Sequence, residues 1–464
     1  MRLAFVLGVI AMTRIAAADD ETPGENVPAA AAPVAVAPDQ VSGVAIDEHG
    51  EDHPVYRGLL LPVRYLTIGI MAPFRGGAYL LERYQLRDRI EQLLFNDDGT
   101  FGVYPTAFIE SQLGFNVGIH AIESNAFGHK EKITAAASYG GEFQQAYEGT
   151  FATGELLGAF HIRARGSYQA WNRSNFFGIG NANQRTPVME TQVDALTDDT
   201  SYHTRFGQDV SHGEIQGTVT AVGPLSFGVT AAYTRRRFNA NAIVDEYEKT
   251  IAQYDATSLV GYLTGVDNFY GEASVTFDTR SYRNRYISLA APSTGWWATA
   301  WIGDTQGIEK DPSDYVRYGV DVHRYIDIYH GDRVLILRGY LEAVTAKLSE
   351  IPFTDLPRIG GNDILRGYEV DRFRDRAAAV VTAEYDWPLH YGLTGYIFCD
   401  MGRVANSVGD LDPSDIHVGY GGGIQVQSLA AFLVRGQIAY SGDGIFFRLA
   451  LDPIADTRSK QRRL

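Results

Sequence analysis

The sequence predicts an all-β fold, a transmembrane antiparallel β-barrel of about 16 strands. The 464 residues include 27 Tyr, 23 Phe and 49 Gly, yet the mean hydropathy is only -0.15. Short runs of alternating apolar and polar residues recur along the chain, and after the N-terminal stretch no window of about 18 uninterrupted apolar residues occurs. Spanning helices are therefore excluded, and membrane-spanning strands are favoured.

The N-terminal residues predict export. "MRLAFVLGVIAM" has a basic Arg2 followed by an apolar run, and Ala16 and Ala18 form an A-x-A cleavage site. Residues 1–18 are therefore interpreted as a signal peptide. Residues 19–50 are rich in Ala, Pro and acidic residues, which predicts a disordered linker.

The segment 51–103 is expected to lie in the periplasm. Between about 75 and 94 its apolar residues fall near helical spacing, after Pro73 and before a stop signal at 96–99. These apolar residues are Leu80, Leu81, Tyr84, Leu86, Ile90, Leu93 and Leu94. They predict one amphipathic helix, which either packs at the periplasmic rim of the barrel or binds a membrane surface or a partner.

From about Tyr104 onward the period of the pattern is two. In "GAFHIRARGSYQAW", 158–171, one face is apolar and the other carries His161, Arg163 and Arg165. In a membrane barrel the apolar face contacts lipid and the polar face lines the lumen, where basic side chains are hydrated. "DRVLILRGYLEAV" and "RAAAVVTAEYDWPL" repeat this arrangement, which favours a barrel over a sandwich.

Sixteen predicted strands make up a barrel over 104–451. They run near 104–112, 114–122, 131–139, 143–153, 158–172, 205–221, 225–239, 268–279, 294–305, 314–327, 331–345, 375–388, 393–404, 416–428, 430–440 and 443–451. The long connections, 173–204, 240–267, 306–313 and 346–374, follow odd-numbered strands, as outer loops do when the chain starts in the periplasm. A basic tail, 452–464, follows the last strand.

Composition and motifs argue against other classes of function. The formal net charge of -16 excludes a nucleic-acid partner, and the single Cys399 excludes an intramolecular disulfide. Glu384, Asp386 and Asp400 could form the acid/base set of a hydrolase, but no G-x-S-x-G motif occurs and no histidine lies in the predicted strands that carry these three carboxylates, so we expect no enzyme. The histidines lack metal-ligand spacing, and neither a metal nor a cofactor is expected. The acidic runs at 96–99 and 410–415 are either turns or calcium sites.

Several motifs between 358 and 404 resemble one known family. "GGNDILRGY", "FRDRAAAVVTAEYDWPL" and "GYIFCDMGRV" are similar to the C-terminal barrel of the BamA/TamA family, the bacterial surface-antigen group that includes the transporters of two-partner secretion. "FFGIGN" (176–181) and "FDTRS" (277–281) also resemble loop and turn signatures of this family. The resemblance implies a barrel with a long sixth extracellular loop that is inserted in the lumen.

The resemblance also implies a set of site residues. The family's R-G-Y/F loop tip corresponds to Arg366, Gly367 and Tyr368, its F-x-D-x-G motif to Phe398, Asp400 and Gly402, and its acidic residue on the twelfth strand to Glu384. Alternation independently places Glu384 and Asp400 on the lumen face, where both carboxylates can converge on the planar guanidinium of Arg366. Gly367 would relieve backbone crowding and Tyr368 would fill space at the wall. We therefore hypothesise that Arg366 pins the loop inside the barrel.

The sequence departs from the family pattern at both ends. Between the signal peptide and Tyr104 no β-α-α-β-β pattern of a periplasmic POTRA (polypeptide-transport-associated) domain is expected, and a tail replaces the usual C-terminal aromatic. The resemblance implies an integral protein of the bacterial outer membrane that assists the insertion or translocation of proteins. Its partners would be outer-membrane lipids and unfolded outer-membrane or secreted proteins. The alternative is a passive or lipid-handling pore that kept the fold without the assembly role.

Overall fold

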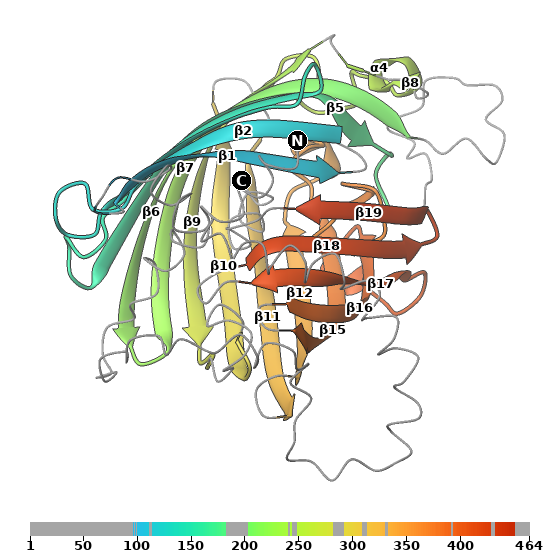
Figure 1. Ribbon diagram of the computed structural model, residues 1–464. Coiled ribbons are helices and arrows are strands. Elements are labelled where there is room, and N and C mark those ends of the chain that lie inside the picture. Colours follow the sequence, from blue (N-terminus) through green and yellow to red (C-terminus); the bar gives the residue numbers. More distant parts are fainter. Residues whose placement is uncertain are drawn as a thin grey trace, which may run out of the picture.

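The computed structural model of the protein describes residues 96, 98, 100–110, 114–181, 203–239, 242–243, 248–281, 292–308, 313–329, 333–390, 393–427 and 432–450. One large sheet of 17 strands makes up most of this part (Figure 1). The signal peptide predicted at 1–18, the linker at 19–50, the helix at about 75–94 and the tail at 452–464 lie outside the described residues.

Sixteen of these strands form a curved wall. They are β1 (Phe101–Glu110), β2 (Gly114–Glu123), β3 (Lys132–Tyr139), β4 (Gln144–Ala152), β5 (Phe160–Phe176), β6 (Thr204–Val222), β7 (Leu225–Asn239), β9 (Val266–Asp278), β10 (Gly295–Gly307), β11 (Tyr315–Tyr329), β12 (Arg333–Val344), β15 (Ala377–His390), β16 (Leu393–Ala405), β17 (His417–Gln427), β18 (Phe432–Ser441) and β19 (Gly444–Ala450). Each predicted strand overlaps one of them, in the same order, and the predicted fold class is confirmed. The clearest difference is that β5 continues to Phe176, because Asn175 and Phe176 still pair with the start of β6.

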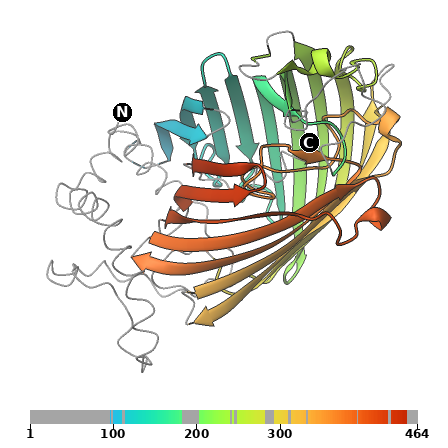
Figure 2. The ribbon, with the colours of Figure 1, turned by 90° about the vertical axis from the view of Figure 1, so that its right-hand side faces the viewer.

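Wall strands that follow one another in the sequence are neighbours in the sheet and pair antiparallel. β1 also pairs with β19, through Ile109–Leu449 and Glu110–Arg448, and we call this contact the seam. Figure 2 shows how the wall curves until the first and last strands lie close together. The β1–β2 ladder has ten residue pairs whereas the seam has two, which makes the seam the shortest ladder between the described wall strands.

Side chains alternate between the two faces of the wall as predicted. Phe160, Ile215 and Val381 lie on the outer face and are 60%, 58% and 61% exposed, as expected for a surface in contact with membrane hydrocarbon. Several charged side chains on the lumen face are buried and paired, as Arg165 is with Glu148 at 2.7 Å. Because an unpaired buried charge is costly, this pairing is what allows a polar face inside the wall.

The β12–β15 connection, residues 345–376, is here called loop 6. It contains η2 (Leu348–Glu350) and a small hairpin of β13 (Arg358–Ile359) and β14 (Phe373–Arg374). The apolar side chains of its second half, from Ile359 onward, pack against the lumen face of the wall in one buried cluster. The members are Trp301, Tyr340, Ile359, Ile364, Leu365, Tyr368, Phe373, Ala378, Val380 and Val404. Loop 6 is therefore folded back into the barrel rather than spread over its outer rim.

A second apolar cluster joins three outer connections. Phe176 contacts Tyr254 and Phe353 edge to face, with ring centroids 4.9 and 5.1 Å apart. Tyr254 follows α4 (Thr250–Gln253), a short helix in the β7–β9 connection beside β8 (Glu248–Lys249), and Phe353 belongs to loop 6. The three connections share one core, which also packs against the outer ends of β5, β6, β7, β11 and β12. Within the described ranges, no helix has the length and apolar character needed to cross a membrane.

Candidate functional site

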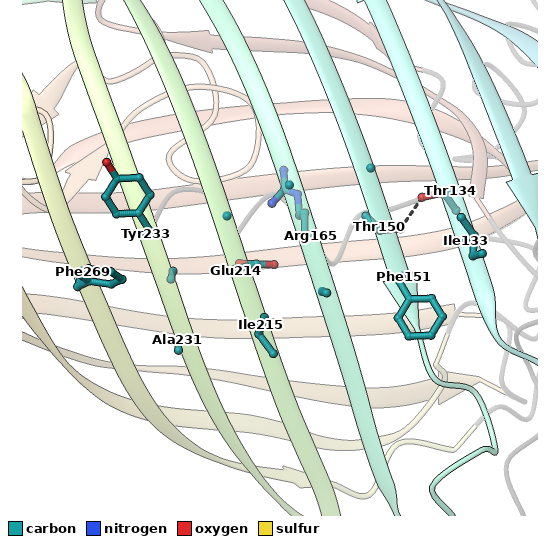
Figure 3. Close-up of a pocket in the computed structure, with 15 residues that line it drawn as sticks. Ile133, Thr134, Thr150, Phe151, Arg165, Glu214, Ile215, Ala231, Tyr233 and Phe269 are labelled. Carbon is teal, nitrogen blue, oxygen red and sulfur yellow. Dashed lines mark hydrogen bonds between the residues drawn. The ribbon is translucent and has the colours of Figure 1, made fainter.

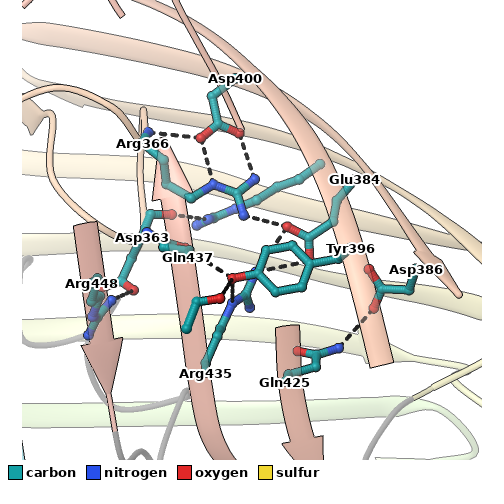
Figure 4. A network of polar contacts seen from close by, with 12 residues as sticks. Asp363, Arg366, Glu384, Asp386, Tyr396, Asp400, Gln425, Arg435, Gln437 and Arg448 are labelled. Atoms are coloured by element: carbon teal, nitrogen blue, oxygen red, sulfur yellow. Dashed lines mark hydrogen bonds and ion pairs between the residues drawn. The ribbon is translucent and has the colours of Figure 1, made fainter. Parts of the chain in front are cut away.

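Arg366 of loop 6 contacts two carboxylates on the lumen face of the wall (Figure 4). Its Nε and Nη2 donate to Oδ2 and Oδ1 of Asp400, each over 2.8 Å, and its backbone N–H donates to Oδ2 over 2.8 Å. Its Nη1 donates to Oε2 of Glu384. Burial by itself would lower the pKa of Arg366, but the attraction of Glu384 and Asp400 raises it above its ordinary value. The guanidinium is therefore a permanent cation held at three points.

The wall positions both carboxylates through its register. Asp400 of β16 pairs with Thr382 of β15, and Glu384 lies two residues further along β15, so both side chains point to the lumen. Phe398, opposite Glu384 in the ladder, places its ring under Arg366, with the ring centroid 3.5 Å from Cζ. The F-x-D pair thus supplies both an aromatic face and a carboxylate to the same cation.

Gly402, the last residue of the F-x-D-x-G motif, allows close packing against loop 6. A Cβ at this position would lie 2.9 Å from Cγ2 of Val380 and 3.2 Å from Cδ1 of Ile359 in β13. Both distances are shorter than ordinary van der Waals contact. The glycine therefore lets the small hairpin of loop 6 lie flat on β15 and β16.

The tip of loop 6 lies against β17 and β18. A Cβ at Gly419 of β17 would be 1.9 Å from the carbonyl oxygen of Arg366, so only glycine fits there. Gly367 has a φ of +92° and its carbonyl accepts a hydrogen bond from Ser441 Oγ. Tyr368 donates to the carbonyl of Val418 over 3.2 Å. The three residues of the R-G-Y tip thus face three different parts of the wall.

Glu384 has a second cationic partner that sequence reasoning missed. Arg435 of β18 donates from Nη2 to both carboxylate oxygens of Glu384, over 3.1 and 3.0 Å, and from Nε to the hydroxyl of Tyr396 over 3.0 Å. Asp386, two residues beyond Glu384, accepts instead from Gln425 over 3.2 Å. The alternation of apolar and polar residues in β18 could have placed Arg435 on the lumen face. It does not predict which lumen carboxylate Arg435 contacts.

A second set of polar contacts fixes the first half of loop 6, and sequence reasoning missed it too. The carboxylate of Asp355 accepts from Arg236 Nη1 over 2.5 Å, from Asn268 Nδ2 over 3.2 Å and from the hydroxyl of Tyr315 over 3.0 Å. The backbone carbonyl of Asp355 accepts from Arg317, which is also paired with Glu342. Burial would raise the pKa of Asp355, but Arg236 and Arg317 lower it below the ordinary value. We call Asp355 and Arg366 the two anchors of loop 6.

The motif "FFGIGN" has a structural place beside loop 6. Arg374 of β14 is 1% exposed, and its Cζ lies 4.9 Å from the ring centroid of Phe176. Its Nη1 and Nη2 donate to the carbonyls of Phe353 and Asn175, over 3.2 and 3.1 Å. Burial lowers the pKa of Arg374 to about 10. At the other end of the motif, Asn181 accepts from the backbone N–H of Val404 over 2.9 Å, so the motif connects loop 6 to the end of β16.

The other sequence candidates have simpler surroundings. Cys399 lies between the exposed outer-face residues Ile397 and Met401 in β16. Asp412 of the acidic run at 410–415 accepts from Ser414 N–H over 2.8 Å and pairs with Arg403, as in a turn. Throughout the part of the chain that the structure describes, no three His, Cys, Asp or Glu residues are grouped so that they could hold a metal ion.

Comparison with known proteins gives a family and a fold. The Omp85 superfamily domain matches residues 125–445. The structure is similar to that of BamA from Haemophilus ducreyi lacking POTRA domains 1-3, with a TM-score of 0.52 and 11% identity over 75% of this chain and 69% of that chain. It is also similar to CdiB from Escherichia coli, with a TM-score of 0.48 and 13% identity over 75% of this chain and 62% of that chain. For CdiB from Acinetobacter baumannii the TM-score is 0.44 and the identity is 8%, over 75% of this chain and 59% of that chain.

This chain thus spans less than two thirds of each CdiB chain. No protein of curated function matches the sequence. The family match covers more than half of the chain, and the fold likeness to BamA agrees with it, so the resemblance predicted from the motifs is confirmed. The chain belongs to the Omp85 superfamily of outer-membrane β-barrels.

Proposed function

We propose that this barrel assists the insertion of proteins into the outer membrane, or their translocation across it. The seam is the observation that supports this most directly. Among the described residues it holds two ladder pairs, Ile109–Leu449 and Glu110–Arg448. In hydrocarbon an unsatisfied backbone group costs several kcal/mol, so a strand edge exposed by opening of the seam favours the addition of a further strand. An incoming membrane strand can add to either edge by backbone hydrogen bonding.

Loop 6 contacts the seam strand β19 as well as the wall. Asp363 Oδ1 accepts from Arg448 Nη1 over 3.1 Å, and Arg448 is the residue opposite Glu110 in the seam. Arg372 donates from Nε to Asp443 Oδ2, in the turn before β19, over 2.6 Å. In this proposal, Arg366 keeps loop 6 in place and loop 6 in turn holds β19 in one position. The function requires no catalytic reaction and no cofactor.

A passive or lipid-handling pore is the second candidate, and the polar lumen face favours it. Arg165 with Glu148 and Arg338 with Asp321 are pairs that a water-filled passage would accommodate. The buried clusters of loop 6 speak against an open passage, since they occupy the lumen face and join the outer connections. A passive pore also has no use for a seam that opens.

Depletion of the protein followed by quantitative proteomics of the outer membrane separates the two functions. An assembly role predicts a fall in the levels of other barrel proteins or of secreted proteins before growth slows. A pore predicts unchanged barrel-protein levels together with altered uptake of small solutes. Unchanged levels of every outer-membrane and secreted protein would count decisively against the assembly role.

A further inference from the structure

The outer face of the wall between β3 and β9 contains an apolar groove of about 630 Å³ (Figure 3). Figure 3 views it from outside, with Phe151, Ile215, Tyr233 and Phe269 on the near side of the strands and Arg165 and Glu214 behind them. The volume lies in the range of about 300–1,000 Å³ that small-molecule sites occupy. On this face of a membrane barrel, the surrounding medium is lipid.

Glycines make the floor of this groove. Gly149, Gly166 and Gly213 stand opposite one another on β4, β5 and β6, in a single row across the ladders. A Cβ at Gly166 or Gly213 would meet nothing within 4 Å, so the row is open space and not a close backbone approach. Because three neighbouring positions carry no side chain, the groove is a channel wide enough for a flexible hydrocarbon chain.

Larger side chains form the walls of the groove. Tyr147 and Tyr168, stacked with ring centroids 6.4 Å apart, lie one outward position above the glycine row, and Phe151 and Ile215 lie one position below it. The row itself continues into Tyr233 of β7 and Phe269 of β9, which closes one end. A hydrocarbon chain in the channel would therefore be in contact with rings on three sides.

Charged groups lie on the same outer face, above the groove and toward the extracellular ends of the strands. Arg235, opposite Ser211 in the ladder, has a 57% exposed side chain, and its ion pair with Asp267 is long at 3.8 Å. Arg237 pairs closely with Asp267. Asp209 accepts only from neutral donors, the hydroxyl of Tyr168 over 3.4 Å and Asn239 Nδ2 over 3.2 Å. The band thus offers one loosely held cation and one carboxylate with no cationic partner among the described residues.

We propose that the groove binds an acyl chain of a zwitterionic phospholipid, with the phosphate at Arg235 and the ammonium group at Asp209. The two arginines and two aspartates of the band balance in charge, so an anionic headgroup gains nothing there that a zwitterion does not. Arg235 and Asp209 are diagonal neighbours on β7 and β6, about 7–8 Å apart along the sheet, which a single headgroup can bridge. A primary ammonium group also donates hydrogen bonds to a carboxylate, which a quaternary one does not. The inference is independent of the proposed function.

The acyl site is tested with phosphatidylethanolamine that carries a photoreactive diazirine in its chain, in vesicles containing the full-length protein. Labelled peptides are mapped by mass spectrometry. Labelling of the peptides around Phe151 and Tyr233 should fall at least about fivefold in the Gly166→Leu/Gly213→Leu variant, which fills the floor. Gly217→Leu is the matched control, because Gly217 lies on the same face of β6, outside the groove, and also has open space at its Cβ. Equal labelling in all three proteins would mean that only ordinary surrounding lipid is present, and would overturn the proposal.

Competition in the wild-type protein tests the headgroup and does not depend on how the variants fold. Unlabelled phosphatidylethanolamine should reduce labelling of the groove in a saturable manner, whereas phosphatidylglycerol and phosphatidylcholine should compete several-fold less well. Asp209→Asn should remove this preference without abolishing labelling. Competition that does not saturate would overturn the groove as a binding site, and equal competition by all three lipids would overturn the assignment of Arg235 and Asp209.

Discussion

Arg366 and Asp400 form a two-point contact, in which Nε and Nη2 of the guanidinium donate to Oδ2 and Oδ1 of the carboxylate, each over 2.8 Å. Both side chains are buried, and residues 34 positions apart in the chain meet here. A buried ion pair is a weak source of net stability, but the loss of one partner leaves the other charge uncompensated. This asymmetry makes the contact suited to hold one arrangement of loop 6 against all others.

Replacing Arg366 by Ala should release loop 6 while the barrel stays folded and inserted. The change leaves Asp400 and Glu384 without this cation, at a cost of roughly 3–5 kcal/mol that the loop can escape by leaving the lumen. Limited proteolysis of membranes should then cut within 360–376. Arg165→Ala is the control, because Arg165 is an equally buried lumen arginine whose partner, Glu148, lies in the wall. If loop 6 is as protected in the Arg366 variant as in the wild type, the hypothesis that Arg366 pins the loop is wrong.

Gly419→Ala should release the same loop without removing any polar contact. The new Cβ would lie 1.9 Å from the carbonyl oxygen of Arg366, so the tip has to move away from β17. Proteolysis should give the same fragments as Arg366→Ala. Gly271→Ala, on the outer face of β9 with open space at its Cβ, should cause no change. Protection of loop 6 in the Gly419 variant would show that the tip tolerates displacement of its backbone.

Asp355→Asn should loosen the first half of loop 6 and remove one acid-dependent step. The pKa of Asp355 is lowered in the folded protein from an ordinary value of 3.8. A lowered carboxyl pKa contributes stability that is complete above the unfolded pKa and is lost as the pH falls through the folded one. Protection around Thr354 should therefore be constant between about pH 5 and 7 in the wild type and fall only in stronger acid.

Hydrogen exchange of peptides from loop 6, corrected for the intrinsic pH dependence, measures this step. In Asp355→Asn, protection should be lower at every pH and the fall in stronger acid should be absent. Glu148→Gln is the control, since Glu148 pairs with Arg165 away from loop 6. A wild-type protein that loses protection already near neutral pH would contradict the role of the Asp355 carboxylate.

Arg374→Ala should separate the motif at 176–181 from loop 6. The substitution removes hydrogen bonds to the carbonyls of Phe353 and Asn175 and leaves a cavity beside Phe176, which together should cost about 2–5 kcal/mol. Arg374→Lys should recover only part of this stability, because a single ammonium group does not reproduce the planar fork. Thermal unfolding of the purified barrel measures the loss. Equal melting of wild type and both variants would show that Arg374 does not hold these segments together.

A covalent link across the seam should block the proposed function. Ile109 and Leu449 are ladder partners, so cysteines at both positions, in a Cys399→Ser background, are placed to form a disulfide. Oxidised cells should show the same loss of outer-membrane proteins as depleted cells, and a reductant should reverse it. The control pair is Ile119 and Ala137, partners in the β2–β3 ladder, whose link should have no effect. Full function with the seam linked would exclude strand addition at this edge.

The strands were predictable because the wall repeats one simple rule. Each wall strand alternates a lipid-facing and a lumen-facing residue, and this period is visible in the sequence wherever the strand is long enough. The same parity placed Glu384 and Asp400 on the lumen face, and the structure brings both to Arg366. Contacts between lumen-facing side chains of different strands follow no such period in the sequence. Arg435 reaches Glu384 from a strand 51 residues away, and nothing in its own segment indicates that distance.

Loop residues and ladder lengths lie beyond what alternation can predict. Asp355 stands in an irregular segment, "PFTDLP", where spacing carries no information about the side chain's direction. The length of the seam depends on how far the whole barrel shears before its ends meet, a property of all the registers together. The sequence could therefore predict that the first and last strands are neighbours, but not the register Ile109–Leu449 and Glu110–Arg448 in which the described residues pair.

The two anchors of loop 6 have a mechanical consequence. Asp355 is tied to β7, β9 and β11, and Arg366 is tied to β15 and β16, so the short segment between them is a chord drawn across the barrel. A segment fixed at both ends resists any change in the distance between these two groups of strands, in the way that a tie rod holds two walls together. Strand number and shear set the girth of the barrel. The tie adds stiffness on this side of the wall, and cutting either end removes it.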